Sequence, residues 1–361
     1  MHLNINLDWL SPKSPPLLGL DISSTSVKLV ELSDTGKGKL RVERYVIEPL
    51  PKDAVTDGNI ANLDQVAETL GIAWKNLGTR IKNVALALPS SAVITKKILV
   101  SASLTGADLE NQVETEANQV IPFSLDEVNL DFQVLGPSPA SPDDVQVLLA
   151  AARKEKVEDR VAACEAAGLK AMVLDVESFA TQTAYEQVAH LLPDEGAGLV
   201  VAMIDVGAHN MHINILNDNE SVYLREHAFG GNQLSVEISR RYGMSIEEAE
   251  TAKCKGALPD SYQEEVLQPY RETLAMEIGR AIQLFTTSTQ FLHVDQILLA
   301  GGGAMIAGID DVVAQRTSTP TMLANPFANM AVNSKIRPQA LAADAPSLFV
   351  ACGLAMRRFE S

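Results

Sequence analysis

One arrangement of residues occurs twice in this chain, and it constrains the fold more than any other feature. An apolar run ends in an aspartate, a turn of small residues follows, and a second apolar run begins. The copies span Leu17–Val30 and Val200–Leu216, with Asp21 in the first and Asp205 in the second. Each copy is typical of a β-hairpin with one buried carboxylate at its turn. The repetition predicts two related halves that face each other across a cleft.

The turns of both copies carry groups that are suited to phosphate. Backbone N–H groups and small hydroxyl side chains can surround anionic oxygens. The candidate phosphate-binding residues are Asp21, Ser23, Ser24, Thr25 and Lys28 in the first copy, and Asp205, Gly207 and Ala208 in the second. An ordinary hairpin whose aspartate caps its own turn, with a solvated lysine on the strand, is the alternative for a single copy.

Two glycine-rich segments stand at the entrances of expected helices in the second half. Glycine has no Cβ, so a flat or anionic ligand can approach the backbone closely. A tight turn between two elements explains the same residues without a ligand. The candidate residues are Gly230, Gly231 and Asn232 in one segment, and Gly301, Gly302 and Gly303 in the other.

Four charged groups are further candidates for nucleotide chemistry. Glu177 begins the helix that joins the two halves, where its carboxylate could polarise a water for hydrolysis or stabilise the helix N-terminus electrostatically. Asp21 and Asp205 could hold Mg²⁺ through water, because this ion favours few carboxylates together with phosphate oxygens. Lys253 could contact a ribose, or it could be a solvated helix lysine.

The composition argues against several classes of protein. The formal net charge of −17 at pH 7 makes nucleic acid or an anionic membrane surface an improbable main partner. The three cysteines, Cys164, Cys254 and Cys352, lie far apart and indicate neither a disulfide framework nor a zinc site. The first residues lack the pattern of a signal peptide. Apolar runs such as Leu348–Met356 are too short to span a bilayer.

The remaining pattern predicts a mixed α/β chain with a small inserted domain. Strands over Leu40–Val46 and Val84–Leu88 flank a helix whose apolar residues share one face. Within the insertion, a capping pair at Thr105 and Asp108 is expected to begin a helix that runs to about Val120. Two strands are expected after it, at Val128–Val134 and Val145–Ala151. In the second half, helices are expected at Gln233–Tyr242, at Gln268–Phe291, from about Met305 and at Leu348–Phe359. A further helix is expected to begin after Ser245, which would be its N-cap with Glu248 at the reciprocal position.

These motifs together resemble the phosphate, connecting and adenosine motifs of the actin-like ATPase superfamily. Within it, the chain is similar to the PilM family of type IV pilus assembly proteins, relatives of the division protein FtsA. The segments that carry the resemblance are Leu18–Lys28, Glu114–Phe123, Asp175–Phe179, Phe229–Leu234, Leu299–Gly303 and Ala324–Phe327.

The resemblance implies an α/β fold of the bilobal actin-like ATPase type, a duplicated ribonuclease H-like fold with an FtsA-like inserted subdomain. The implied parts are a flexible tail at residues 1–16, a first lobe at 17–89, 152–196 and 340–361, the inserted subdomain at 90–151, a second lobe at 197–232 and 275–339, and a helical subdomain at 233–274.

The resemblance also implies a cytoplasmic protein at the inner membrane that binds ATP or ADP with Mg²⁺. The implied partner is the N-terminal cytoplasmic peptide of PilN, and through it PilO and PilP. The resemblance further implies contact with pilus motor ATPases and a role in twitching motility, and it is compatible with self-association. It implies neither direct insertion into the membrane nor binding of nucleic acid. The expected peptide groove joins the inserted subdomain to the first lobe and is lined by Phe123, Val128, Leu130 and Phe132.

Three observations qualify this interpretation. Superfamily members usually carry a threonine late in the second hairpin, where this sequence has Met211 and His212, so we expect slow hydrolysis or none. An FtsA-like filament-forming protein and a sugar kinase remain alternatives, although no second carboxylate cluster and no basic amphipathic C-terminus are visible. The segment Ile5–Trp9 is somewhat similar to the partner peptide and could occupy the groove.

Overall fold

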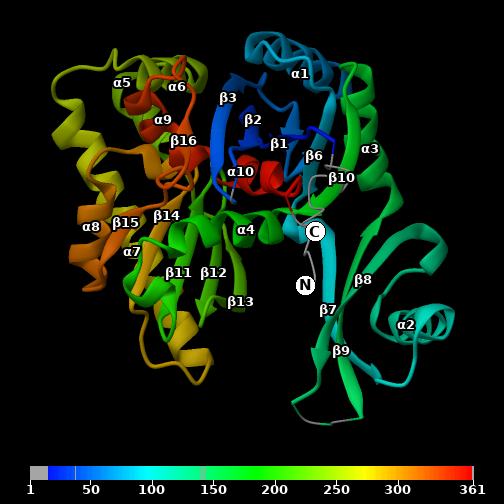
Figure 1. Ribbon diagram of the computed structural model, residues 1–361. Helices are drawn as coiled ribbons and strands as arrows, with labels where there is room; N and C mark the ends of the chain where they lie inside the picture. Colours follow the sequence, from blue (N-terminus) through cyan, green and yellow to red (C-terminus); the bar gives the residue numbers. More distant parts are fainter. Residues whose placement is uncertain (1–14, 37, 140, 142, 360–361) are drawn as a thin grey trace, which may run out of the picture. The chain divides into compact units, whose positions relative to one another are not determined.

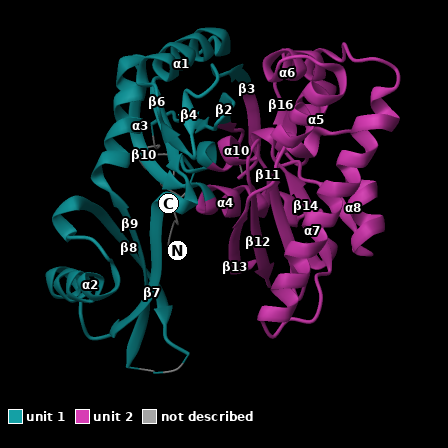
Figure 2. Cartoon of the chain, turned by 180° about the vertical axis from the view of Figure 1, so that it is seen from behind, with its two compact units in different colours: residues 1–32, 45–177, 354–361 teal, residues 33–44, 178–353 magenta. Residues whose placement is uncertain are grey.

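The computed structural model describes residues 15–36, 38–139, 141 and 143–359, so most of the expected tail, with Ile5–Trp9, lies outside the described residues. Two compact units divide the chain (Figure 2), namely residues 1–32, 45–177 and 354–361 in unit 1, and residues 33–44 and 178–353 in unit 2. This division assigns residues 178–196 and 340–353 to the second unit. The finer lobe and subdomain boundaries stay predictions.

The first sheet has the strand order β10-β6-β1-β2-β3-β16. Its strands are β1 (Leu18–Ile22), β2 (Ser26–Asp34), β3 (Leu40–Pro49), β6 (Asn83–Leu88), β10 (Lys170–Val176) and β16 (Ala331–Val332). β1 is antiparallel to β2 but parallel to β6, which is parallel to β10. The carboxyl ends of β1, β6 and β10 therefore lie along one edge, which is where ligands bind to α/β sheets.

Two helices, α1 (Leu63–Leu77) and α3 (Lys154–Ala166), pack on this sheet. The side chain of Asn62 accepts the Gln65 N–H at the start of α1, and Gly78 ends the helix in a left-handed conformation. The apolar face that the sequence predicts for α1 is buried in the core against β1, β2 and β6.

The inserted segment forms its own three-stranded sheet, in the order β7-β9-β8. The strands are β7 (Val93–Ser101), β8 (Val128–Pro137) and β9 (Asp144–Arg153), and α2 (Gly106–Val120) covers one face (Figure 1). The expected helix and strands are confirmed. The expected capping bond is wrong, because Thr105 precedes α2 without a hydrogen bond from its side chain.

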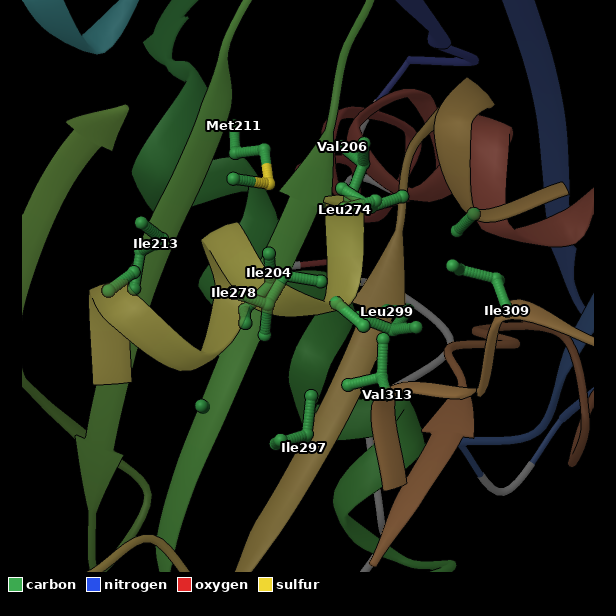
Figure 3. Close-up of a cluster of buried hydrophobic side chains, with 14 of the residues drawn as sticks. Ile204, Val206, Met211, Ile213, Leu274, Ile278, Ile297, Leu299, Ile309 and Val313 are labelled. Atoms are coloured by element: carbon green, nitrogen blue, oxygen red, sulfur yellow. The ribbon is translucent and has the colours of Figure 1, made fainter. Parts of the chain in front are cut away.

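The sheet of unit 2 has the order β13-β12-β11-β14-β15. Its strands are β11 (Val200–Val206), β12 (Met211–Asn217), β13 (Glu220–His227), β14 (Gln296–Ala300) and β15 (Thr321–Leu323). One face packs against α7 (Gln268–Ser288) and α8 (Ile309–Thr317). Figure 3 shows that Ile204, Ile213 and Leu299 of the sheet meet Ile278 of α7 and Val313 of α8. This core includes residues from both strands of the second hairpin.

The opposite face of that sheet is covered by α4 (Glu177–Ala189) and α10 (Phe349–Met356). The backbone of Gly353 lies so close to the carbonyl of Ala180 that a Cβ at position 353 would overlap it. The stretch Pro338–Met356, which begins with α9 (Pro338–Asp344), is apolar and long enough to cross a membrane, but 72% of it is buried inside the structure. That burial is typical of a core helix.

The helices after β13 differ in part from expectation. α5 (Asn232–Tyr242) and α6 (Ile246–Lys255) are confirmed, and the capping box of Ser245 and Glu248 is present. α7 ends at Ser288 rather than Phe291, because hydroxyls such as that of Thr289 bond to carbonyls of its last turn. The helix expected from Met305 is wrong in its start, since a short 3₁₀ turn at Gly302–Met305 precedes α8.

Short elements complete the fold. A two-stranded hairpin of β4 (Val55–Thr56) and β5 (Asn59–Ile60) follows β3. The other short stretches are 3₁₀ turns at Ser90–Ala92, Leu125–Glu127, Pro193–Gly196 and Ala345–Leu348, and a π-helical turn at Gln263–Leu267.

Candidate functional site: two hairpin turns and two glycine loops

The first hairpin turns tightly between β1 and β2. The N–H and the hydroxyl of Ser23 both donate to the Ser26 carbonyl, at 3.0 and 2.9 Å. Ser23 is thus committed to the turn. Ser24, which is half-buried, and Thr25, which is exposed, form its tip. These two residues are the better candidates for contact with phosphate.

Asp21 and Lys28 form an ion pair across the first hairpin. They are cross-strand neighbours, and Lys28 Nζ donates to Asp21 Oδ2 at 2.8 Å. Both side chains are largely buried, with 12% of Lys28 and 7% of Asp21 exposed. Lys28 is therefore not an ordinary solvated lysine. The pair places one positive and one negative charge beside the turn, with their charges balanced.

The turn of the second hairpin is bound to the start of α5. Gly207 N–H donates to the Asn210 carbonyl at 2.9 Å, which closes the turn. Gly231 N–H donates to the Gly207 carbonyl at 2.9 Å, and Asn232 N–H donates to the Ala208 carbonyl at 2.8 Å. The sequence predicted both segments separately, and the fold brings them together.

Gly230 is required at this junction for packing. A Cβ at position 230 would lie 2.5 Å from the Gly207 carbonyl oxygen and 2.6 Å from that of Ala208. The Gly230 carbonyl accepts the hydroxyl of Tyr270 at 3.1 Å, and Tyr270 stacks on Phe229. Burial raises the pKa of Tyr270, which keeps the hydroxyl protonated as a donor. Close packing thus explains Gly230 without a ligand.

The second glycine loop meets the same hairpin. Gly301 has φ +85°, and a Cβ there would overlap Asp205 Oδ1; a Cβ at Gly303 would overlap the side chain of Val206. Gly302 has open space around its Cβ position. Packing therefore accounts for the outer two glycines, and Gly302 is the one whose backbone a ligand can approach.

The strand after the second turn presents histidine, not methionine, to the side of Asp205. His212 is the cross-strand neighbour of Asp205, so both side chains lie on one face of the sheet. Met211 is fully buried in the core on the other face. Of Met211 and His212, His212 is therefore the residue whose side chain lies beside Asp205.

Lys253 belongs to a small polar cluster between α5 and α6. Its Nζ donates to Glu250 Oε2 at 2.6 Å and to Ser235 Oγ at 2.9 Å, and Ser235 also donates to Glu250. Burial raises the pKa of Glu250, but the hydrogen bonds from Lys253 and Ser235 outweigh it and lower the pKa below its usual value. Lys253 is thus already paired, which differs from a solvated lysine.

The residues available for a metal fit a loosely held ion. Among residues 15–359, apart from 37, 140 and 142, no group of three or more His, Cys, Asp or Glu side chains could hold a metal ion. Asp21 lies in unit 1 and Asp205 in unit 2, and a single carboxylate of this kind suits a hydrated Mg²⁺ whose direct ligands would be phosphate oxygens. That is the usual arrangement for this ion.

Two arginines that the sequence interpretation did not treat as site residues interact with carboxylates of unit 1. Arg357 contacts Asp175 through Nε at 2.8 Å and through Nη2 at 3.2 Å, and the Asp175 side chain is 1% exposed. Arg160 of α3 interacts electrostatically with Glu177 and Asp21. Neither pairing could be read from local sequence, because the partners are far apart in the chain.

The predicted groove residues lie in the inserted subdomain, on the sheet face that α2 covers. Phe123, Leu130 and Phe132 are partly buried against the core of this subdomain, whereas Val128 is buried, with 4% exposed. The guanidinium of Arg153 lies 4.2 Å from the ring centre of Phe123. Val128 is therefore available to a partner only indirectly, through its neighbours.

Comparisons with known proteins agree with this architecture. A family model described as type IV pilus assembly protein PilM matches residues 19–359. A solved PilM-PilN type IV pilus biogenesis complex is similar with a TM-score of 0.77 and 27% identity, covering 97% of this chain and 100% of that one.

More distant structures share the fold. Ethanolamine utilization protein EutJ from Carboxydothermus hydrogenoformans is similar with a TM-score of 0.56 and 15% identity, over 95% of this chain and 89% of that one. Ta0583, an archaeal actin homolog, is similar with a TM-score of 0.50 and 14% identity, over 96% of this chain and 100% of that one. The expected actin-like α/β fold is confirmed.

Proposed function

We propose a function that proceeds from one premise: the match over residues 19–359 shows that this chain belongs to the PilM family of type IV pilus assembly proteins. Our proposal is that the chain is a nucleotide-binding scaffold of the pilus assembly platform. It acts at the cytoplasmic face of the inner membrane, where it binds PilN and connects it to the pilus motor, and so serves twitching motility.

The proposed ligand is ATP or ADP with Mg²⁺. The observation that carries this proposal lies in unit 2, where the Asp205 hairpin turn is in backbone contact with both the Gly230–Gly231 and the Gly301–Gly303 loops. Three segments distant in sequence are thereby joined around one aspartate. Unit 1 contains a hairpin of the same kind, with the Asp21–Lys28 pair. Bound Mg²⁺ would neutralise the phosphate charge.

Each part of the site has a proposed role. The backbone and hydroxyls of Ser24 and Thr25, and the backbone at Gly207 and Ala208, bind phosphate oxygens. The open backbone at Gly302 lies against the nucleoside. Glu177 orients the attacking water in any hydrolysis. We propose that the nucleotide acts mainly as a conformational ligand and only secondarily as a substrate. The reason is that His212 lies where the superfamily usually has a threonine hydroxyl.

The proposed partner is the N-terminal cytoplasmic peptide of PilN. A solved relative of this chain is a PilM-PilN complex, which supports the choice of partner. Within the described residues, β8 pairs with β9 alone, so its outer edge offers unpaired backbone groups to an extended peptide. The half-buried Leu130, Phe132 and Phe123 nearby supply apolar anchors. PilO, PilP and the motor ATPases would be reached through this assembly.

Titration of a labelled PilN N-terminal peptide into the full chain, with and without Mg-ATP, tests the partner proposal. Loss of one buried anchor costs about 2 kcal/mol or more, so Leu130→Asp should weaken binding by roughly thirtyfold. Leu292→Asp is the matched control, because Leu292 is 89% exposed and lies in unit 2. A folded Leu130→Asp variant that binds like the wild type would contradict the proposed groove.

A further inference from the structure

Arg160 is a buried arginine at the first hairpin. It belongs to α3 and is 3% exposed. Burying a guanidinium is costly unless hydrogen bonds and opposite charges compensate for the lost water. Its Nη2 donates to the Gly58 carbonyl at 3.0 Å, and its Nη1 donates to the Ile22 carbonyl at 3.4 Å. Both acceptors are backbone carbonyls, one at the end of β1 and one at the tip of the β4–β5 hairpin.

The Ile22 carbonyl belongs to the peptide that opens the first turn. The N–H of the same peptide is that of Ser23, and it donates to the Ser26 carbonyl at 3.0 Å. This peptide plane is therefore held from both sides, by Arg160 on one and by the turn itself on the other. The peptide that begins the Ser24–Thr25 tip is thus fixed at its start, and the hydrogen bonds from Ser23 to the Ser26 carbonyl close the tip at its other end.

The second acceptor ties Arg160 to a rigid support. Gly58 lies at the tip of the β4–β5 hairpin with φ +73°, and a Cβ there would come 2.6 Å from Cγ of Pro89. Pro89 directly follows β6, so the hairpin tip is packed against the end of that strand. Arg160 thus connects the end of β1 to a support that is itself fixed.

The charge of Arg160 also acts on the candidate site. Burial lowers the pKa of Arg160 below its usual value, and the carboxylates of Glu177 and Asp21 offset part of this lowering. The guanidinium and the two carboxylates therefore attract one another at this hairpin. Lys28 is a second cation beside Asp21.

We propose that Arg160 is a positioning residue for phosphate binding at the first hairpin. It orients the N–H groups of the Ser24–Thr25 tip through the Ile22 carbonyl and holds the charges of Glu177 and Asp21 in place. This inference rests on the proposed nucleotide-binding function and adds to it a residue that does not touch the ligand.

The test compares ATP, ADP and AMP affinities of the full chain by calorimetry, in Arg160→Met, Arg160→Lys and the control Lys156→Met. Lys156 lies on the same helix and is 32% exposed. Because the tip that Arg160 supports would then be less well ordered for phosphate, Arg160→Met should weaken ATP binding by roughly tenfold or more. AMP binding should change much less, because the turn contacts the distal phosphates. Arg160→Lys, which keeps the charge, should be intermediate.

The outcomes separate this inference from the function on which it rests. Failure of the wild type to bind any nucleotide would overturn both. Nucleotide binding by the wild type, with an unchanged ratio of AMP to ATP affinity in folded Arg160→Met, would overturn the positioning role alone. If Arg160→Met does not fold, the same ratio in Arg160→Lys decides, and an unchanged ratio there again contradicts the role.

Discussion

The backbone of Gly301 lies against the carboxylate of Asp205, so closely that a Cβ at position 301 would overlap Oδ1. Gly301 also has φ +85°, a conformation that side chains disfavour. The loop after β14 can therefore pack against the second hairpin only because glycine has no Cβ at position 301. This contact is a matter of packing, and it places the neighbouring Gly302 backbone beside the hairpin.

Gly301→Ala should destabilise the protein by about 2 kcal/mol or more, because strain at a positive φ adds to the overlap with Asp205. Gly302→Ala is the matched control, since its Cβ would meet open space. Chemical denaturation of both variants measures the difference. Equal stabilities would mean that the loop is not packed as described.

Arg357→Met should lower the free energy of unfolding by about 3 kcal/mol, because it removes the ion pair between Arg357 and the buried Asp175 carboxylate. Arg358→Met is the control, because Arg358 makes one hydrogen bond, to the Leu32 carbonyl at 3.3 Å. Loss of that bond should cost about 1 kcal/mol. A larger effect at Arg358 than at Arg357 in urea unfolding would refute this ranking.

The Glu250 cluster should give stability that depends on pH. Its pKa is lowered in the folded state, so the contribution is present above the unfolded pKa of about 4.3 and is lost as the pH falls through the lower folded value. Glu250→Gln should therefore be less stable than the wild type at pH 7, with the gap closing in acid. Glu247→Gln, which removes one exposed carboxylate from the same helix, is the control. A gap that is constant with pH would argue against ionisation as its cause.

The two hairpins were predictable from sequence because each is local: apolar runs, an aspartate and small turn residues specify the strands and the turn within a short stretch. The capping box at Ser245 was predictable for the same reason. The start of the helix near Met305 was not, because the packing of Gly303 on Val206 shapes the turn before it.

The candidate site was predictable only in part. The sequence indicated the glycines, but not that Gly230 and Gly301 meet the same hairpin. Arg160 and Arg357 carry no local signal, since their partners lie far away in the chain. Lys28 and Lys253 were visible as charges, whereas their pairing with Asp21 and Glu250 depends on the folded structure.

ATP hydrolysis should be slow, well below the median enzyme turnover of roughly 10 per second. His212 rather than a hydroxyl residue neighbours Asp205, so fewer hydroxyls face the phosphates. Glu177→Gln should lower the remaining rate while nucleotide affinity stays nearly constant. Phosphate release under single-turnover conditions measures the rate, and calorimetric titration measures the affinity. Turnover at ordinary enzymatic rates would show that the site is a catalytic one.

Nucleotide binding itself is the central claim, and thermal unfolding of nucleotide-free protein tests it most directly. A ligand that binds only the native state stabilises it by about 2.7 kcal/mol at a hundredfold excess over Kd. We expect a clear rise in Tm with Mg-ATP, a smaller rise with ATP and excess chelator, and almost none in Asp205→Asn. An unchanged Tm at millimolar Mg-ATP would contradict the account.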